Sequence, residues 1–302
     1  MSSRTKSSEK DPIKRWSPGP IPSHPLEGKA NDPRLAAALA ARERWHGRSG
    51  RPALKSPTQA VAFARERRLV HIKTPSPLPN LLDPIVGRSL SDEEREEGQA
   101  VTTLEGWMSE LRNSPDLVEV RLCFERPTFI QADLWPCLKT IGRAHDEELR
   151  KDRSLPPEVR EALEILDRRG IVATDRLGEM LDLEPEDTER LCGFLESRLV
   201  VLSRTEYDEY EEREVRVVEP ILRWLDRTPY QEREITRERS WTFLFIGALR
   251  SAVALWPDEI AAIFPWTEAE REHAIKEAMT TGTMIPYYEE GQQVLVASPV
   301  PR

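Results

Sequence analysis

The order of helical and strand patterns between residues 154 and 205 constrains the fold of this 302-residue chain more than any other feature. The segment LPPEVREALEILDRRG places Val159, Leu163 and Leu166 on one apolar stripe with helical spacing. The stripe stops at Gly170, and glycine is typical of the residue that follows a helix. The pattern therefore predicts a helix over about 156–169.

A short strand, two further helices and a closing strand are predicted after this helix. They are Ile171–Val172, a helix capped by Thr174 or Asp175, a helix opened by Pro185, and Leu199–Leu202. Helix, short strand, helix, turn, helix and strand is the order of a winged helix-turn-helix. A helical bundle has a similar helical pattern and stays as the alternative.

The same order recurs at the end of the chain. The predicted elements are a helix over Ser240–Leu255, a short helix over Asp258–Phe264, a helix capped by Thr267 and ended by Gly282, and a hairpin of Met284–Tyr288 with Gln293–Ala297. Two copies in one chain favour the winged-helix interpretation over a bundle. The hairpin would then be the wing.

The patterns predict an α+β, helix-rich fold of tandem winged helix-turn-helix domains. In the first half they predict helices over 31–45, 56–67 and 101–111 and strands over 69–72 and 118–124. The expected domains are a basic, largely disordered leader with one short helix (1–50), an N-terminal winged-helix-like region (51–153), a central winged helix (154–230) and a C-terminal winged helix (231–302).

Charge is distributed unevenly along the sequence. Residues 1–90 contain 17 Lys and Arg against 7 Asp and Glu, an excess of +10, although the whole chain carries −9. The remaining residues therefore carry −19. A basic leading segment can recruit a polyanion or bind the acidic surface of its own chain.

Several classes of protein are excluded or disfavoured by the sequence. The longest apolar stretch, Trp241–Trp256, contains Arg250 and is shorter than the ~20 residues of a membrane helix. The basic, polar start has no apolar signal-peptide region, and three scattered cysteines indicate reduced thiols, so a cytoplasmic protein is expected. Motifs for nucleotides, zinc or serine hydrolysis are lacking, and we expect no cofactor and no metal site.

Five segments occur in the order found in one known family. They are SPTQAVAFARERRLVHIKTPSPLP, RPTFIQADLWPCL, LPPEVREALEILDRRG, SWTFLF and IAAIFPWTEAEREHAIKEAM. In this layout the chain resembles the bacterial winged-helix family of interstrand-crosslink DNA glycosylases (AlkZ/YcaQ-like), as a divergent branch. The resemblance implies tandem winged helices around a DNA channel, metal-free hydrolysis of the N-glycosidic bond of alkylated nucleotides, and a role in crosslink repair.

The resemblance also implies where the chemistry would lie. Active members carry a Gln-x-Gln or Gln-x-Asp motif, and His71 and Lys73 occupy those positions here. Active members also carry a histidine shortly before the Leu134-Trp135-Pro136 element, where this chain has Glu125 or Arg126. His71, Lys73 and Glu125 are therefore the candidate catalytic residues. Because a lysine repels the cationic transition state of glycosidic hydrolysis, the altered motif leaves open whether the chain is an enzyme.

Basic residues near these two motifs are the candidate nucleic-acid-binding residues: Arg65, Arg67, Arg68, Arg121, Arg126, Lys139 and Arg143. Residues 155–205, by contrast, hold 7 basic against 12 acidic residues, which repel phosphate. We therefore expect duplex DNA as the partner, with a non-catalytic adaptor or regulator that uses its acidic winged-helix faces on a protein partner as the alternative. Trp16 and Trp45 lie among basic residues, where they would stack on a base or pack back on a domain.

Overall fold

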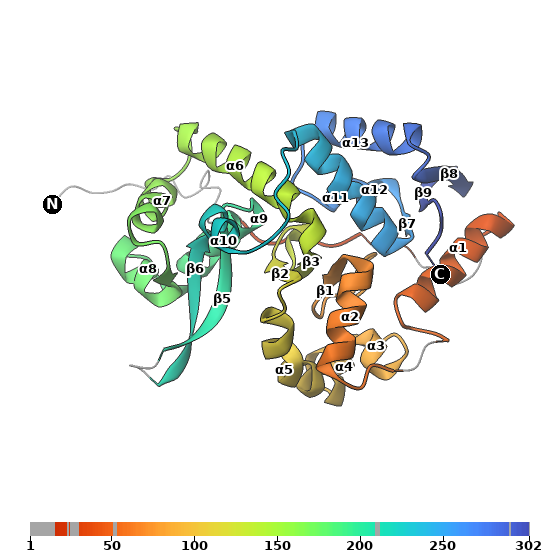
Figure 1. Cartoon of the computed structure of the whole chain (residues 1–302), viewed down its shortest axis with the longest axis horizontal. Coiled ribbons are helices and arrows are strands. Elements are labelled where there is room, and N and C mark those ends of the chain that lie inside the picture. Colours follow the sequence, from red (N-terminus) through yellow and green to blue (C-terminus); the bar gives the residue numbers. More distant parts are fainter. Residues whose placement is uncertain are drawn as a thin grey trace. The chain divides into compact units, whose positions relative to one another are not determined.

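The computed structural model describes residues 16–22, 24, 30–50, 53–208, 212–289 and 291–301. These residues form a helix-rich α+β protein with three small antiparallel sheets (Figure 1). The chain divides into two compact units. For the described residues, the central unit lies within 1–19 and 138–229, and the split unit lies within 20–137 and 230–302.

The central unit combines helices with one three-stranded sheet. Its elements are α6 (Trp135–Lys151, which starts in the split unit), α7 (Pro157–Arg169), β4 (Val172–Ala173), α8 (Thr174–Leu181), α9 (Pro185–Ser197), β5 (Val201–Asp208), β6 (Arg213–Pro220) and α10 (Ile221–Arg227). The predicted helices over 156–169 and from Pro185 are confirmed. Helices α6 and α10 and strand β6 had no sequence prediction.

The apolar stripe of α7 forms the core of the central unit, as its spacing predicts. Val159, Leu163 and Leu166 pack with residues of α9 and the sheet. Trp16 also packs against this core, and its ring lies so close to Gly193 on α9 that a Cβ there would be 2.2 Å away. Of the two roles considered for Trp16, the structure therefore places it against the domain.

Strands β5 and β6 form a long hairpin in the central unit (Figure 1). Their register runs from Val201 opposite Pro220 to Asp208 opposite Arg213, and β4 pairs with β6. The sequence predicted a strand ending at Leu202, so the hairpin is much longer than expected.

The first part of the split unit contains one sheet and five helices. The elements are α1 (Pro33–Trp45), α2 (Pro57–Arg67), β1 (Leu69–His71), α3 (Asp83–Val86), α4 (Asp92–Glu96), α5 (Gln99–Arg112), β2 (Leu117–Val120), η1 (Cys123–Glu125), β3 (Thr128–Gln131) and η2 (Ala132–Leu134). The helices predicted over 31–45 and 56–67 are present, and side chains cap their starts, since Asp32 accepts from the amide of Arg34 and Ser56 from that of Gln59. Helix α1 packs against β7 and β9 and so belongs to the core of this unit.

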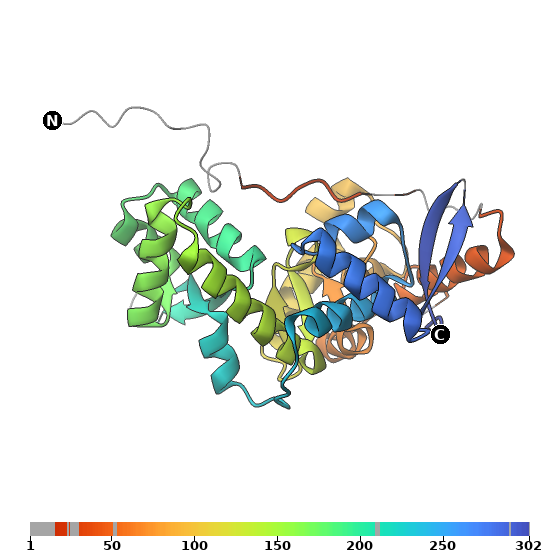
Figure 2. The ribbon, with the colours of Figure 1, turned by 90° about the horizontal axis from the view of Figure 1, so that it is seen from above.

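The second part of the split unit follows residue 230. Its elements are α11 (Arg237–Ala252), β7 (Ala254–Leu255), α12 (Pro257–Ala262), α13 (Glu268–Thr280), β8 (Met284–Glu289) and β9 (Gln292–Ala297). Thr267 caps α13 as predicted, and α11 and α13 lie side by side (Figure 2). Val253 has φ 68°, which ends α11 and makes Ala254–Leu255 a strand where the sequence predicted helix.

All three sheets have the same strand order. In each sheet the first strand pairs with the third, and the third pairs with the second, giving β1-β3-β2, β4-β6-β5 and β7-β9-β8. Helices lie between the first and second strands in every case. The described residues thus contain three versions of one arrangement.

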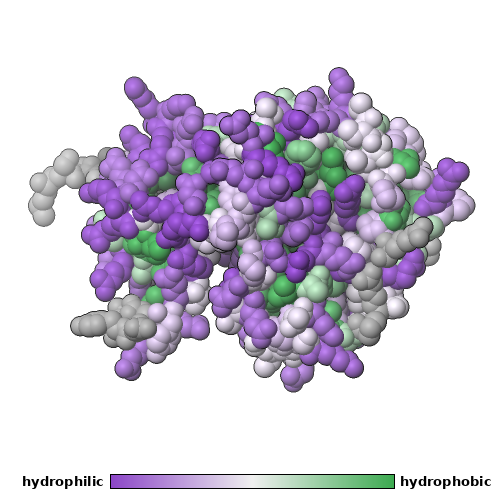
Figure 3. Space-filling view, viewed as in Figure 1, coloured by the Kyte–Doolittle hydropathy of each residue, from purple (hydrophilic) through white to green (hydrophobic). Residues whose placement is uncertain are grey.

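One face of the central unit is strongly hydrophilic (Figure 3). Hydrophilic side chains dominate the face of the central unit that Figure 3 shows, and apolar side chains appear there in small separate patches. None of the helices in the described part of the chain has the length and apolarity to cross a bilayer.

Candidate functional site

The His71-Ile72-Lys73 segment lies at the end of β1. His71 pairs with Thr128 of β3 across the sheet, and its carbonyl accepts from the amide of Leu81. The side chain of His71 is fully buried, whereas that of Lys73 is 40% exposed. Of the two candidate residues, His71 therefore lies in the protein interior and Lys73 lies at the surface.

The hydrogen bonds of His71 determine its tautomer. The hydroxyl of Thr128 donates to the carbonyl of Arg126 over 2.8 Å, so it must accept from Nδ1 of His71, 3.1 Å away. Nδ1 then carries the proton, and Nε2 is buried without a partner among the described residues. Burial lowers the pKa of His71 to about 4. The imidazole is thus neutral at pH 7 and a weak base.

Lys73 forms an ion pair with a carboxylate from helix α5. Its Nζ lies 2.9 Å from Oε1 of Glu105, whose side chain is 60% exposed. An exposed pair of this kind stabilises the fold by only about 0–1 kcal/mol. The pair nevertheless matters electrostatically, because the negative charge of Glu105 balances the positive charge of Lys73.

Glu125 belongs to a short segment with unusual backbone geometry. Phe124 and Glu125 have φ angles of 51° and 55°, in the left-handed region. The amide of Phe124 donates to the carbonyl of Ile263 over 2.8 Å, and its ring lies 6.1 Å from that of His71. The sheet thereby brings His71 close to the segment that carries Glu125, which is itself half-buried.

Most of the predicted nucleic-acid-binding residues of the split unit face acidic partners or the core. Arg65 pairs with Asp116 at 3.2 Å, and Arg68 pairs with Asp133 at 2.6 Å. Arg67 is 1% exposed and lies over the rings of Trp45 and Phe63, at 4.4 and 3.7 Å from their centroids. Arg67 is therefore inaccessible to a nucleic acid in this conformation.

The remaining candidates lie in both units. Arg121 and Arg126 are half-buried in the split unit, and burial lowers the pKa of Arg126. Lys139 and Arg143 lie on α6 in the central unit, where Lys139 pairs with Asp226 at 2.8 Å and Arg143 is exposed. Each unit thus holds part of the predicted set.

A buried ionic network supports the loop after Lys73, and sequence reasoning missed it. Asp83 is fully buried and accepts from Arg48 and Arg95, each at 2.7 Å. Asn80 donates to the same carboxylate, and Arg95 also donates to the backbone carbonyl of Lys73. These residues come from three separate segments, so neither spacing nor composition shows that they meet.

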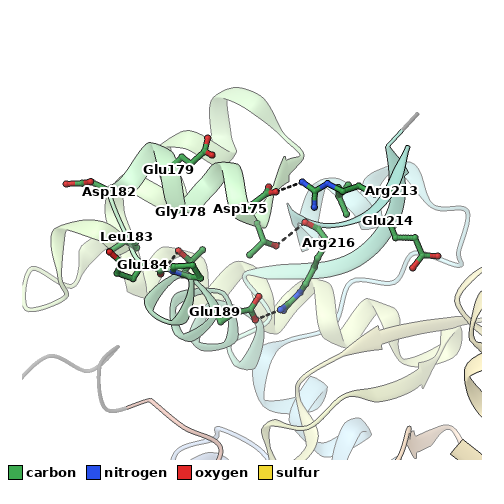
Figure 4. Close-up of a pocket in the computed structure, with 14 residues that line it drawn as sticks. Asp175, Gly178, Glu179, Asp182, Leu183, Glu184, Glu189, Arg213, Glu214 and Arg216 are labelled. Carbon is green, nitrogen blue, oxygen red and sulfur yellow. Dashed lines mark hydrogen bonds and ion pairs between the residues drawn. The ribbon is translucent and has the colours of Figure 1, made fainter. Parts of the chain in front are cut away.

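An acidic pocket in the central unit lies between α8, α9 and β6 (Figure 4). Asp175 pairs with Arg213, and Glu189 pairs with Arg216. The other acidic residues of its lining are exposed and form no ion pair among the described residues: Glu179, Asp182, Glu184 and Glu214. The pocket therefore carries an excess of negative charge.

The three cysteines, Cys123, Cys137 and Cys192, are buried free thiols. In the described part of the chain, His, Cys, Asp and Glu side chains do not gather in groups of three that would hold a metal ion.

Comparison with known proteins gives a relationship at the level of fold. No family model matches the chain, and no curated protein matches its sequence. Among solved structures, the Streptomyces sahachiroi DNA glycosylase AlkZ superposes with a TM-score of 0.53 at 10% sequence identity. The match covers 86% of this chain and 69% of the other. The two chains share a fold. At this identity the likeness extends to the fold alone.

Proposed function

We propose that this chain is a DNA-associated protein of three tandem winged-helix modules that binds duplex DNA without hydrolysing N-glycosidic bonds. The observation that carries the proposal is the state of the His71-Ile72-Lys73 segment, in which a buried neutral imidazole and an ion-paired lysine occupy the expected catalytic positions. The fold shared with a DNA glycosylase supports the association with DNA.

The winged-helix interpretation is supported by the repeated strand order. In the central unit, α8 and α9 correspond to the helix-turn-helix, and the β5–β6 hairpin corresponds to the wing. The elements α12, α13 and β8–β9 follow the same plan, as do the helices and strands between α2 and β3.

The chemistry of base release supports the non-hydrolytic part of the proposal. Glycosidic cleavage develops positive charge on the sugar, which a nearby carboxylate or amide stabilises, and it needs a positioned water. His71 is buried and a weak base, so it does neither. Lys73 balances the charge of Glu105, the carboxylate that contacts it.

The proposal is tested with duplexes that contain N7-alkylguanine. We expect fluorescence anisotropy to show binding, and abasic-site assays to show no base release above the uncatalysed rate. Glu105→Gln and Lys73→Ala should leave base release at that background. Robust release by the native chain, abolished by Lys73→Ala, would overturn the proposal and indicate a lysine-based mechanism.

The basic start of the chain gives a second test of DNA association. Residues 1–15 lie outside the described residues and contain five Lys and Arg against two Asp and Glu. Each neutralised phosphate contributes about −0.9 to the salt slope on duplex DNA, so deletion of residues 1–15 should flatten that slope. Deletion to residue 50 is unsuitable, because it removes the buried face of α1. An unchanged slope would exclude a role for residues 1–15.

A second candidate function, favoured by the acidic pocket of the central unit, is that of an adaptor for a basic protein segment. Glu179 and Glu184 extend from α8 and the α8–α9 turn without ion pairs among the described residues (Figure 4). An arginine-rich peptide should bind the native chain and lose affinity with Glu179→Gln/Glu184→Gln. Glu147→Gln, on α6, is the matched control, since Glu147 is exposed and outside the pocket.

A further inference from the structure

A second pocket, in the split unit, is lined by side chains from separate segments of the chain. Its volume is about 500 Å³, and its polar lining includes Arg42, Arg48, Arg95, His24 and Glu259. Pro75, Ser76 and Pro77, which follow the His71–Lys73 segment, form one side. Pockets of about 300–1,000 Å³ are typical of small-molecule sites.

Arg42 is a buried charge with no carboxylate within ion-pair distance among the described residues. It is 1% exposed and donates from Nη2 to the carbonyl of Pro77 at 2.9 Å and from Nη1 to that of Ala254 at 3.5 Å. Its Nε has no partner, and Arg42 forms no ion pair with any described carboxylate. Buried charges are usually paired, because removal of an ion from water is costly. Glu259, in the same lining, acts on Arg42 through its charge without forming an ion pair, and burial outweighs this effect and lowers the pKa of Arg42 to about 10.

Arg48 and Arg95 add two further guanidinium groups with unused donors. Arg48 binds Asp83 through Nε and Glu43 through Nη1, which leaves its Nη2 without a partner among the described residues. Arg95 uses Nη1 and Nη2 for Lys73 and Asp83, which leaves its Nε. Guanidinium groups in fixed orientations are well suited to bind phosphate oxygens.

Glu259 supplies a carboxyl group that keeps its proton to a higher pH than usual. It is 1% exposed, and its Oε2 accepts from the amide of Trp256 at 2.8 Å. Burial raises the pKa of Glu259 to about 7, although the charges of Arg42 and His24 act in the opposite direction. A protonated carboxyl group donates a hydrogen bond to an anion instead of repelling it.

The charges around the pocket then balance in favour of an anion. Arg42, Arg48 and Arg95 carry three positive charges against the two negative charges of Asp83 and Glu43. The excess of one positive charge is present when Glu259 is protonated and is cancelled when Glu259 is ionised. His24, at the edge of the pocket, contacts Asp258 at 2.8 Å and stacks on Trp256 with ring centroids 5.0 Å apart.

We propose that this pocket binds a phosphate monoester, with the phosphoryl oxygens held by Arg42, Arg48 and Arg95. The volume exceeds that of a phosphate ion and suits a group of the size of a mononucleotide. A free nucleotide and the 5′-phosphate of a DNA end share this chemistry. The proposal does not rest on the proposed function, because it is argued only from the residues that line this pocket.

The first experiment is titration calorimetry on the full chain. A nucleoside 5′-monophosphate should bind, and inorganic phosphate should bind more weakly at the same site, whereas the nucleoside without phosphate should give no heat. A 5′-phosphorylated single strand is compared with its unphosphorylated form. Binding of the mononucleotide supports a small-molecule ligand, and preference for the phosphorylated strand supports a DNA end. Equal binding of nucleoside and nucleotide would overturn the proposal.

The second experiment uses variants. Arg42→Gln should weaken binding of the nucleotide by at least tenfold, and Arg44→Gln, an exposed neighbour on α1 outside the pocket, should leave it unchanged. Ser89→Asp places a negative charge on the exposed edge of the lining and should also weaken binding, which keeps the test valid if Arg42→Gln fails to fold. The nucleotide should raise the Tm of the native chain by more than that of Ser89→Asp. Unchanged affinity in both pocket variants would overturn the proposal.

Discussion

Nη2 of Arg95 donates to Oδ1 of Asp83 over 2.7 Å, with the arginine side chain 8% exposed and the carboxylate completely buried. Arg48 binds the other oxygen of the same carboxylate. One buried anion thus joins α3 and α4 to the chain after α1.

The first prediction concerns this carboxylate. Asp83→Asn removes the negative charge but leaves two buried arginines, so it should lower the free energy of unfolding by about 3–5 kcal/mol. Urea denaturation measures the loss. Glu96→Gln is the control, because Glu96 is exposed on α4 and should change stability by less than about 0.5 kcal/mol. Equal stability of the two variants would show that the network is dispensable.

The second prediction concerns His71, whose folded-state pKa of about 4 lies below the ordinary value of 6.5. Below pH 6.5 the unfolded chain binds more protons than the folded one. The stability from neutral His71 is therefore complete above pH 6.5 and is lost as the pH falls towards 4, by about 3 kcal/mol.

His71→Asn should remove this part of the acid sensitivity. The measurement is the difference in free energy of unfolding between the native chain and the variant from pH 4 to 7, which cancels the titration of other groups such as His46. A difference that does not vary with pH would contradict the buried, neutral state of His71.

The sequence predicted those elements whose apolar pattern and caps lie within one segment. Helices α2, α7 and α13 carry their own signals, such as the caps Ser56 and Thr267. Helix α6 was missed although it is long. Strand β6 was missed because its charged residues, such as Arg213 and Arg216, pair with side chains of distant segments.

The candidate site was less predictable than the fold. The position of the His71-Ile72-Lys73 segment was predicted, but the burial of His71 follows from pairing with β3, which is distant in sequence. Arg67 was expected to bind nucleic acid, yet it is buried between Trp45 and Phe63. Charge alone does not tell a surface arginine from one that stacks inside the core.

The third prediction concerns Trp266, which is half-buried at the start of α13. Its ring lies 5.2–6.0 Å from those of Trp241, Phe245 and Phe264. Trp266→Ala should therefore cost about 3 kcal/mol of stability, at the low end for a buried tryptophan. Trp266→Phe should cost less, because Nε1 has no hydrogen-bond partner to lose among the described residues. A loss near zero for Trp266→Ala in thermal unfolding would indicate a partner-facing side chain.

The last prediction concerns Glu259, whose folded-state pKa of about 7 lies above the ordinary value of 4.5. Between these two values the folded chain binds more protons than the unfolded one, so the stability falls as the pH rises. The contribution is complete below pH 4.5 and is lost through pH 7, by about 3 kcal/mol.

Glu259→Gln keeps an oxygen for the amide of Trp256 and does not ionise. Its stability relative to the native chain should therefore increase from pH 5 to 8, as measured by urea denaturation, whereas Glu268→Gln, an exposed residue of α13, should show no such trend. A constant difference for Glu259→Gln across this range would mean that the carboxyl group is already ionised at pH 5 in the folded chain, and that the pocket beside Arg42 holds its own counter-charge.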